Sequence, residues 1–437
     1  MKSAFSIGIS LAISTTSAIA IEPSYEREPV LYSDTDPNTP LTRIADRIEK
    51  GEMILQGQSD REILVELLEL LEIHLESQLL VFSKTSAQNS RISPRTPRVI
   101  YFSDNAYLGW VQGGNIEAMT FDENLGAVFH MIHLTDREPG RPPVIARERS
   151  CLNCHGGSAT GNFPGGLVRS VFPSETGLPI FHAGTFRTTD ASPLEERWGG
   201  WYVTGRSGKM GHMGNMIAKE VDRESRDVVV EKIHAEPVRD LQEHFDCTPY
   251  PAGGVSDIVA LMIFEHQIKV HNALVQGNLT ARQTLHRHKQ MRKAFNEPRD
   301  APLSETNRGI LENQASKIVR ALLFVDEFEM KNDGVDGSIN FQKAFVEHAR
   351  KDAEFRSLRD LRLYERLFKY RCSYLIYSDA FLHLPDELKS LVFKQLRGIL
   401  TDAPSWPDYD YLSASERRRI LQILEETHPN WPKAENE

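Results

Sequence analysis

The chain has 437 residues, of which 40% are hydrophobic and 26% charged, and its formal net charge is −10. This length exceeds one ordinary domain, and the composition is that of a folded protein rather than a disordered one. The acidic balance makes nucleic acid an unfavourable partner, because nucleic-acid-binding domains present basic surfaces.

The first twenty residues have the organisation of a secretory signal peptide. Met1-Lys2 gives a basic start, 5–13 is apolar, and Ala18-Ile19-Ala20 is a small-residue cleavage sequence. We therefore expect cleavage after Ala20 and export, in a bacterium into the periplasm. An uncleaved N-terminal anchor is the alternative. No later stretch is apolar and long enough to span a bilayer, so we expect no transmembrane segment after cleavage.

Residues 21–97 are expected to form an extended lead-in, a helical segment and a linker. Apolar residues recur at spacings of three and four between Pro40 and Lys84, and Gly51 and Gly57 divide this pattern into two helices. His74 lies within the leucine-rich part, where we expect a packed core histidine. The polar segment 85–97 is interpreted as the linker.

Residues 98–236 are expected to be rich in strands. Short β-branched and aromatic runs occupy 99–102, 108–111 and 127–134, and similar runs return at 167–172 and 199–204. His130 and His133 lie in one of these strands, where alternation places them on opposite faces. We expect the inward-facing one to be a hydrogen-bonded core histidine.

A short motif, Cys151-Leu152-Asn153-Cys154-His155, stands within this strand-rich region. Two cysteines three positions apart, followed directly by a histidine, resemble the haem-attachment motif of c-type cytochromes. The resemblance implies one covalent haem c, with thioethers to Cys151 and Cys154 and with His155 as an axial iron ligand. A zinc half-site and a redox dithiol are the alternatives.

The resemblance is confined to these five residues. Gly156-Gly157 disfavours a continuing helix, so we do not infer the fold of the small cytochromes. A haem motif embedded between strands instead resembles, in layout, PAS-like domains that carry covalent haem. Arg141, Arg147 and Arg149 precede the motif and either meet the haem propionates or form a solvated basic loop.

The sixth iron ligand is expected from the glycine-rich stretch 208–216, which contains one histidine and three methionines. His212 is the first candidate for this metal position. Met213 is the second candidate, chosen from the three methionines of this stretch, and His182 is a third candidate.

From 237 onward the sequence predicts an α-helical domain. The expected helical stretches are 256–275, with Ser256 as its N-cap, 310–331, 341–350, 358–381, 388–400 and 414–427.

The first of these helices carries Glu265, His266 and His271. The two histidines are five positions apart, so they diverge around the helix and cannot chelate one metal. Glu265 is expected at a water-exposed helix edge, or else in a polar pocket facing the haem domain, where a raised pKa would suit proton transfer. Cys247 and Cys372 either form a disulfide or remain two separate buried thiols.

These observations predict an α+β protein with the organisation 1–20 signal peptide, 21–97 lead-in and helical segment, 98–236 strand-rich haem c domain and 237–437 helical domain. The leading function is that of an exported monohaem c-type cytochrome acting in electron transfer with a redox partner protein. A haem-dependent oxidoreductase or peroxidase-like enzyme with an open sixth position, and a haem-based sensor, are the alternatives.

Overall fold

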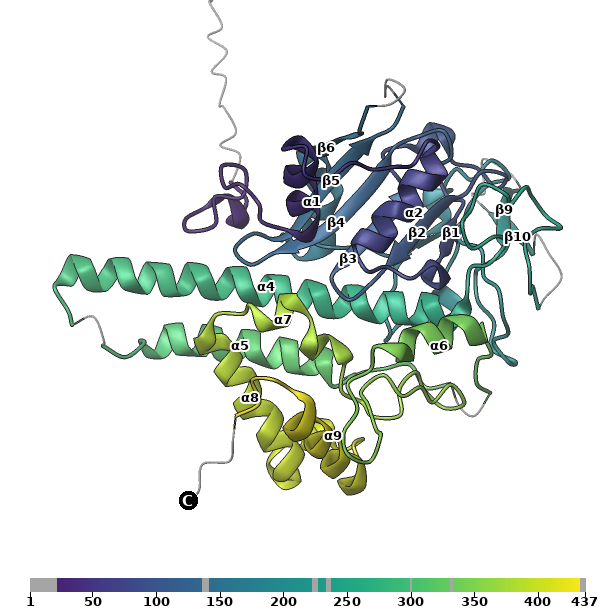
Figure 1. Cartoon of the computed structure of the whole chain (residues 1–437). Helices are drawn as coiled ribbons and strands as arrows, with labels where there is room; N and C mark the ends of the chain where they lie inside the picture. Colours follow the sequence, from purple (N-terminus) through teal and green to yellow (C-terminus); the bar gives the residue numbers. More distant parts are fainter. Residues whose placement is uncertain are drawn as a thin grey trace, which may run out of the picture.

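The computed structural model describes residues 22–135, 141–221, 227–232, 237–298, 301–330 and 333–432. Its centre is a six-stranded antiparallel sheet whose strands lie side by side in chain order (Figure 1). The strands are β1 (Leu79–Val81), β2 (Arg98–Phe102), β3 (Ala106–Trp110), β4 (Ile116–Asp122), β5 (Gly126–His133) and β6 (Val144–Arg147). Short turns connect most neighbours, so each strand pairs with the next one along the chain.

One face of this sheet is covered by the N-terminal helices α1 (Pro40–Glu49) and α2 (Asp60–Leu70). Both helices begin with a capping box, at Thr39 and at Ser59, which satisfies backbone N–H groups that the first turn leaves free. Their leucines and isoleucines form a core with alternate residues of the strands. The strand members of this core are Leu80, Val99, Tyr101, Ala106, Leu108, Trp110, Ile116, Ala118 and Ile132.

The other face of the sheet packs against the long helix α4 (Ile258–Phe295), which runs beneath the strands in Figure 1. The ring of Phe264 lies 5.4 Å from that of Phe102 and 5.7 Å from that of Tyr107. The sheet and the C-terminal helices therefore share one hydrophobic core. This arrangement brings α4 close to the segment that carries the cysteine motif.

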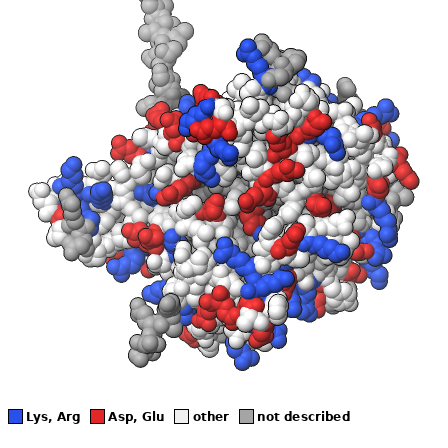
Figure 2. Space-filling view, viewed as in Figure 1, with Lys and Arg blue, Asp and Glu red and all other residues white. Residues whose placement is uncertain are grey.

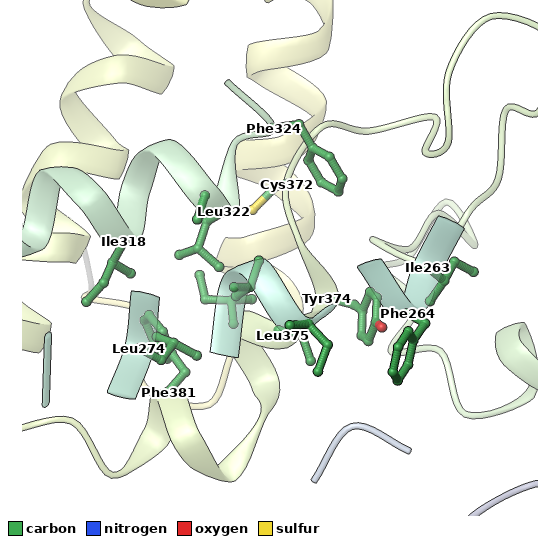
Figure 3. Close-up of a cluster of buried hydrophobic side chains, with 14 of the residues drawn as sticks. Ile263, Phe264, Leu274, Ile318, Leu322, Phe324, Cys372, Tyr374, Leu375 and Phe381 are labelled. Carbon is green, nitrogen blue, oxygen red and sulfur yellow. The ribbon is translucent and has the colours of Figure 1, made fainter. Parts of the chain in front are cut away.

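Five further helices of the described residues lie on the side of α4 that faces away from the central sheet (Figure 1). They are α5 (Glu305–Leu322), α6 (Ile339–Glu347), α7 (Asp379–Leu382), α8 (Asp386–Thr401) and α9 (Ala414–Thr427). Figure 3 shows apolar side chains that interlock between these elements, among them Leu274 of α4, Ile318 of α5 and Phe381 of α7. Burial of such side chains, each contributing roughly 1.5–3 kcal/mol, holds the helices against one another.

Two small two-stranded sheets and one short helix complete the fold. β7 (Arg169–Val171) pairs with β8 (Thr185–Arg187), and β9 (Met216–Glu220) pairs with β10 (Val228–Lys232). The helix α3 (Leu152–His155) carries the end of the cysteine motif.

The predicted α+β class is confirmed, and several predicted element boundaries are wrong. Ser256 is not the N-cap of α4, because its hydroxyl instead links the backbones of Leu80 and Tyr202. Asp257 caps the helix by accepting from Val259 N and Ala260 N. The helix then continues to Phe295, far beyond the predicted end.

Two other predicted elements are absent from the described residues. The stretch 358–381 contains an isolated bridge between Leu361 and Phe368, a 3-10 turn, Tyr374–Tyr377, and the start of α7. Ser373 N donates to Leu322 O, so this segment is held by tertiary contacts rather than by a helical ladder. The stretch 199–204 makes only two isolated bridges, between Trp201 and Val81 and between Thr204 and Asp257.

None of the described helices is both long enough and apolar enough to cross a membrane. Figure 2 shows basic and acidic side chains interspersed over one face of the molecule. The predicted signal peptide, 1–20, lies outside the described residues.

Candidate functional site

The cysteine motif lies at the end of the central sheet. β6 leads into a 3-10 turn, Arg149–Cys151, and α3 follows it directly. The Glu148 side chain accepts from Ser150 N at 2.9 Å and so caps this turn. Cys151 is half-buried and Cys154 is exposed, and both lie within little more than one helical turn, as predicted. The helix ends at Gly156, as the Gly156-Gly157 pair predicts.

The orientation of the His155 ring is fixed by one backbone contact. Its Nδ1 lies 2.8 Å from the carbonyl oxygen of Gly165. A carbonyl only accepts hydrogen bonds, so Nδ1 carries the proton and the lone pair is on Nε2. Burial lowers the pKa of His155 below its ordinary value, which keeps the ring neutral. The ring packs against Phe129 of β5, with centroids 5.1 Å apart.

The loop that supplies this carbonyl is anchored to α4. Gly166 N donates to Asn272 Oδ1 at 2.9 Å, and Asn272 Nδ2 donates back to Gly166 O at 2.9 Å. The Thr160 hydroxyl donates to Phe163 O at 2.7 Å within the loop. Asn272 is therefore a positioning residue for His155, although it lies more than one hundred positions away. No signal in the sequence marks it.

Charged side chains surround the buried side of the motif. Arg98 and Glu117, on β2 and β4, form an ion pair of 2.5 Å. Burial alone would raise the pKa of Glu117, but Arg98 and hydrogen bonds from Gln88 and Ser86 bring it below its ordinary value. Arg98 and Arg169 both act electrostatically on His155. The positive charges of Arg98 and Arg169 therefore favour the neutral imidazole, and the negative charge of Glu117 acts against them.

The surroundings of the cysteines disfavour the two alternatives to haem. Burial and the nearby Glu117 and Glu148 raise the pKa of Cys151 to about 11, whereas reactive dithiols need a lowered one. A zinc site requires further ligands around the cysteines. Among the described residues, one group of three or more metal-ligating side chains has all of its ligand atoms close together. This group does not include the cysteine motif.

The candidates for the sixth ligand occupy different surroundings from His155. The His212 ring packs against Trp198, with centroids 5.4 Å apart, and lines a cavity of about 500 Å³ beside Arg206 and Asp336. Met213 is buried, and its sulfur accepts from the Ser170 hydroxyl of β7 at 3.6 Å. Met213 therefore lies beside β7, the strand that also carries Arg169.

His182 lies in a 3-10 turn, Phe181–Ala183, and pairs with Glu220 of β9 at 3.4 Å. Of the arginines expected near propionates, Arg147 donates to the backbone of Tyr32 and Thr35, and Arg149 donates to Ser33 O. These two guanidinium groups therefore hold the lead-in segment against β6.

The inward-facing histidine of β5 was expected to be a hydrogen-bonded core residue, and this expectation is wrong in one respect. His130 is buried and His133 half-buried, on opposite faces as expected, but both His130 ring nitrogens lack a hydrogen-bond partner among the described residues. Burial, followed by the charge of Arg147, lowers the pKa of His130 to about 4. The ring is therefore neutral and packs as an apolar group.

The expectation of a water-exposed Glu265 is wrong, because its side chain is fully buried. Its Oε2 lies 3.1 Å from Arg197 Nη1, and this guanidinium also donates to the carbonyls of Asp190 and Ser192. Burial raises the pKa of Glu265 to about 7 in spite of Arg197. The pair links α4 to the segment that precedes Trp198.

The neighbouring His266 belongs to a second buried network and does not share a ligand site with His271. His266 Nδ1 lies 2.6 Å from Asp190 Oδ2, and its Nε2 lies 2.8 Å from Ser373 Oγ. All three side chains are buried, so this Asp-His-Ser chain has no access to a substrate and acts as a structural tie. His271 Nδ1 instead contacts the Tyr107 hydroxyl at 2.7 Å.

Cys247 and Cys372 are two separate buried thiols. Cys247 belongs to the core between the sheet and the N-terminal helices, and Cys372 to the core around α4. They do not form a disulfide.

Comparison with known proteins finds no match: no protein-family model, no curated protein and no solved structure is similar to this chain.

Proposed function

We propose that this chain is an exported monohaem c-type cytochrome that transfers electrons to or from a redox partner protein. In this proposal Cys151 and Cys154 hold haem c through thioethers, and His155 Nε2 is an axial ligand of the iron. When bound, the haem supplies a one-electron exchange between ferric and ferrous iron. The proposal applies to the protein after export, with its signal peptide removed after Ala20.

The observation that carries the proposal is the hydrogen bond between His155 Nδ1 and Gly165 O. Metal-ligating histidines usually donate their second ring nitrogen to a carbonyl or a carboxylate, which fixes both the tautomer and the ring orientation. Here that bond leaves a neutral imidazole with its Nε2 lone pair available, beside two reduced thiols on one turn. This is the donor set that a covalently attached haem requires.

The chain's own residues would set the environment of the iron. Asn272 of α4 anchors the loop whose Gly165 carbonyl orients His155. Helix α4 would therefore control the orientation of the imidazole that would bind the iron. Glu117 offsets the charge of Arg98, whereas Arg169 adds positive charge that acts on the imidazole and disfavours the ferric state relative to the ferrous state. The side chain of Arg169 makes no hydrogen bond or ion pair with another described residue, so it is suited to meet a propionate.

For the sixth position we propose His212 or Met213, in that order. Either residue comes from the glycine-containing stretch 208–216, whose backbone can rearrange more readily than an ordinary loop. His212 would have to leave Trp198, and Met213 would have to leave Ser170, for either to reach the iron.

The need for this rearrangement also supports the second candidate function, a haem-dependent oxidoreductase whose sixth position is open or displaceable. If both side chains keep the contacts seen here, the iron has one protein ligand and can bind a small molecule.

An absorption spectrum of the purified protein with carbon monoxide separates the two functions. We expect a low-spin ferrous spectrum that the gas does not change. Replacement of the sixth ligand, in His212→Ala or Met213→Leu, should produce a high-spin spectrum that does bind the gas, while the control Met291→Leu, at an exposed methionine of α4, leaves the spectrum unchanged. A wild-type protein that is high-spin and binds carbon monoxide would contradict the electron-transfer proposal and favour the enzyme.

A further inference from the structure

A cleft of about 900 Å³ lies far from the cysteine motif in the sequence. Its walls come from three parts of the chain: α1 and the segment that follows α2, the turn between β2 and β3, and α6. Among the lining residues are Arg47, His74, Asp104, Phe345 and His348. The N-terminal helical region and the C-terminal helices therefore meet around one solvent-filled space.

Three metal-ligating side chains meet at the edge of this cleft. His74, Glu347 and His348 each offer one ligand atom, and all three atoms lie within 4.8 Å of one another. The rings of His74 and His348 stack, with centroids 5.2 Å apart and an angle of 27° between the planes. The expected packed core position of His74 is thus wrong, because the residue is half-buried at the cleft and lies outside any helix.

The backbone holds these three residues in place from two directions. His74 precedes the 3-10 turn Leu75–Ser77, and Ser77 N and Oγ both donate to His74 O. Glu347 is the last residue of α6 and His348 is its C-cap. The helix and the turn pack against each other. Donors from segments more than 270 positions apart are therefore presented side by side.

The donor set selects the class of metal. Two imidazoles and one carboxylate suit zinc and neighbouring divalent transition metals, whereas calcium and magnesium prefer oxygen donors alone. A tetrahedral site with ligand distances of about 2.0–2.1 Å needs donor atoms roughly 3.3 Å apart. Glu347 and His348 are exposed, so rotation of their side chains can close the remaining distance of up to about 1.5 Å without disturbing the core.

We propose that His74, Glu347 and His348 bind one divalent transition metal ion of the zinc class. Three protein ligands leave one tetrahedral position for water or an anionic group. Because His74 and His348 line the cleft, that position is accessible from it. The ion also joins the N-terminal region to α6 across the cleft edge. The proposal does not depend on the haem proposal, because the two sites share no residue.

The test uses the full chain after signal cleavage, without a histidine tag, purified as it is produced and freed of metal with a chelator. Zinc binding is measured by titration calorimetry, and the bound zinc is examined by X-ray absorption at the zinc edge, where iron does not contribute. We expect one strong equivalent with nitrogen and oxygen neighbours, imidazole scattering and no sulfur. His74→Gln and His348→Gln should each weaken zinc binding about 100-fold, which is the upper end of the loss seen when groups that support a metal's ligands are removed.

The matched control is His286→Gln, which removes a partly exposed histidine of α4 that pairs with Glu28. It should bind zinc as the wild type does. Unfolding temperatures measured with chelator present should agree among all four proteins, and zinc should raise that of the wild type and of the control only. The proposal is overturned if the wild type takes up no zinc, if sulfur appears among the zinc neighbours, or if the two cleft variants bind as tightly as the control.

Discussion

The Arg197–Glu265 pair makes protein stability depend on pH in a way that one substitution should remove. Glu265 has an ordinary pKa of 4.5, and burial raises it to about 7 in the folded protein. The other titratable groups nearby are Asp190, Lys269 and His266, and Asp190 also raises the pKa of Glu265. Arg197 and Thr188 favour the ionised carboxylate, but together they do not offset the cost of burying its charge.

The magnitude follows from the two pKa values. Below pH 4.5 the carboxyl group is neutral in both states, and its favourable contribution to folding is complete. As the pH rises through 7 the folded protein also loses the proton, and that contribution disappears. A difference from 4.5 to about 7 corresponds to about 3 kcal/mol of unfolding free energy. The Glu265→Gln variant stays neutral and can still accept from Arg197, so it should not lose this contribution.

The assay is urea unfolding of wild type and Glu265→Gln at intervals from pH 4.5 to pH 8. Glu327 and Asp257 also have raised pKa values, about 7 and about 6, and the difference between the two proteins removes their effect. Across this range the variant should gain about 3 kcal/mol relative to the wild type. A difference that stays constant with pH, or that falls as pH rises, would refute the reasoning and show that Glu265 is ionised in the folded protein.

Three further predictions follow from the geometry. Arg169→Gln should lower the reduction potential of the proposed haem by about 40 mV, measured by redox titration. The reason is that Arg169 interacts with the iron site by about 1 kcal/mol, and removing its positive charge stabilises the ferric state. An unchanged potential contradicts this. Asn272→Leu should lower the unfolding free energy by about 2 kcal/mol and alter the spectrum of the proposed haem, because the loop at Gly166 loses both of its hydrogen bonds to α4. A spectrum identical to that of the wild type contradicts a positioning role for Asn272. Gly199→Ala should lower the unfolding free energy, measured with urea, by about 2–3 kcal/mol, because the added Cβ would lie 2.1 Å from Val171 O. Gly211→Ala is the control and should leave stability unchanged, because nothing lies within 4 Å of its added Cβ. Equal stability of the two variants contradicts the packing seen here.

The parts of the fold that depend on neighbouring residues could be predicted from the sequence. The helix 414–427 was predicted with the bounds that α9 has, since a capping serine and an amphipathic pattern define both ends. The strands β2, β3 and β5 followed from short apolar runs between turns. The strands β4 and β6 were not predicted, and β1 lies in the stretch between Pro40 and Lys84 that was expected to be helical, which is wrong there. The cysteine motif and the glycine pair that ends its helix were likewise predictable. The haem, its sixth ligand and the export of the chain remain predictions.

The parts that depend on contacts between distant segments could not be predicted. Asn272, which positions the loop of His155, looks in the sequence like any polar residue of a helix. The burial of Glu265 depends on a partner 68 positions away. His74 becomes a candidate ligand only because α6 brings His348 against it. In each case the chemistry arises from tertiary packing, which local periodicity does not encode.

The account's central claim is tested most directly by asking whether haem is covalently bound to Cys151 and Cys154. The exported protein is denatured and extracted with acidified organic solvent, and the intact mass of the polypeptide is then measured. We predict that the pigment stays with the polypeptide, whose mass exceeds that of the mature chain by one haem. The double variant Cys151→Ala, Cys154→Ala should lack it, and Cys247→Ala should keep it. A colourless wild-type polypeptide with the mass of the bare chain would contradict the claim.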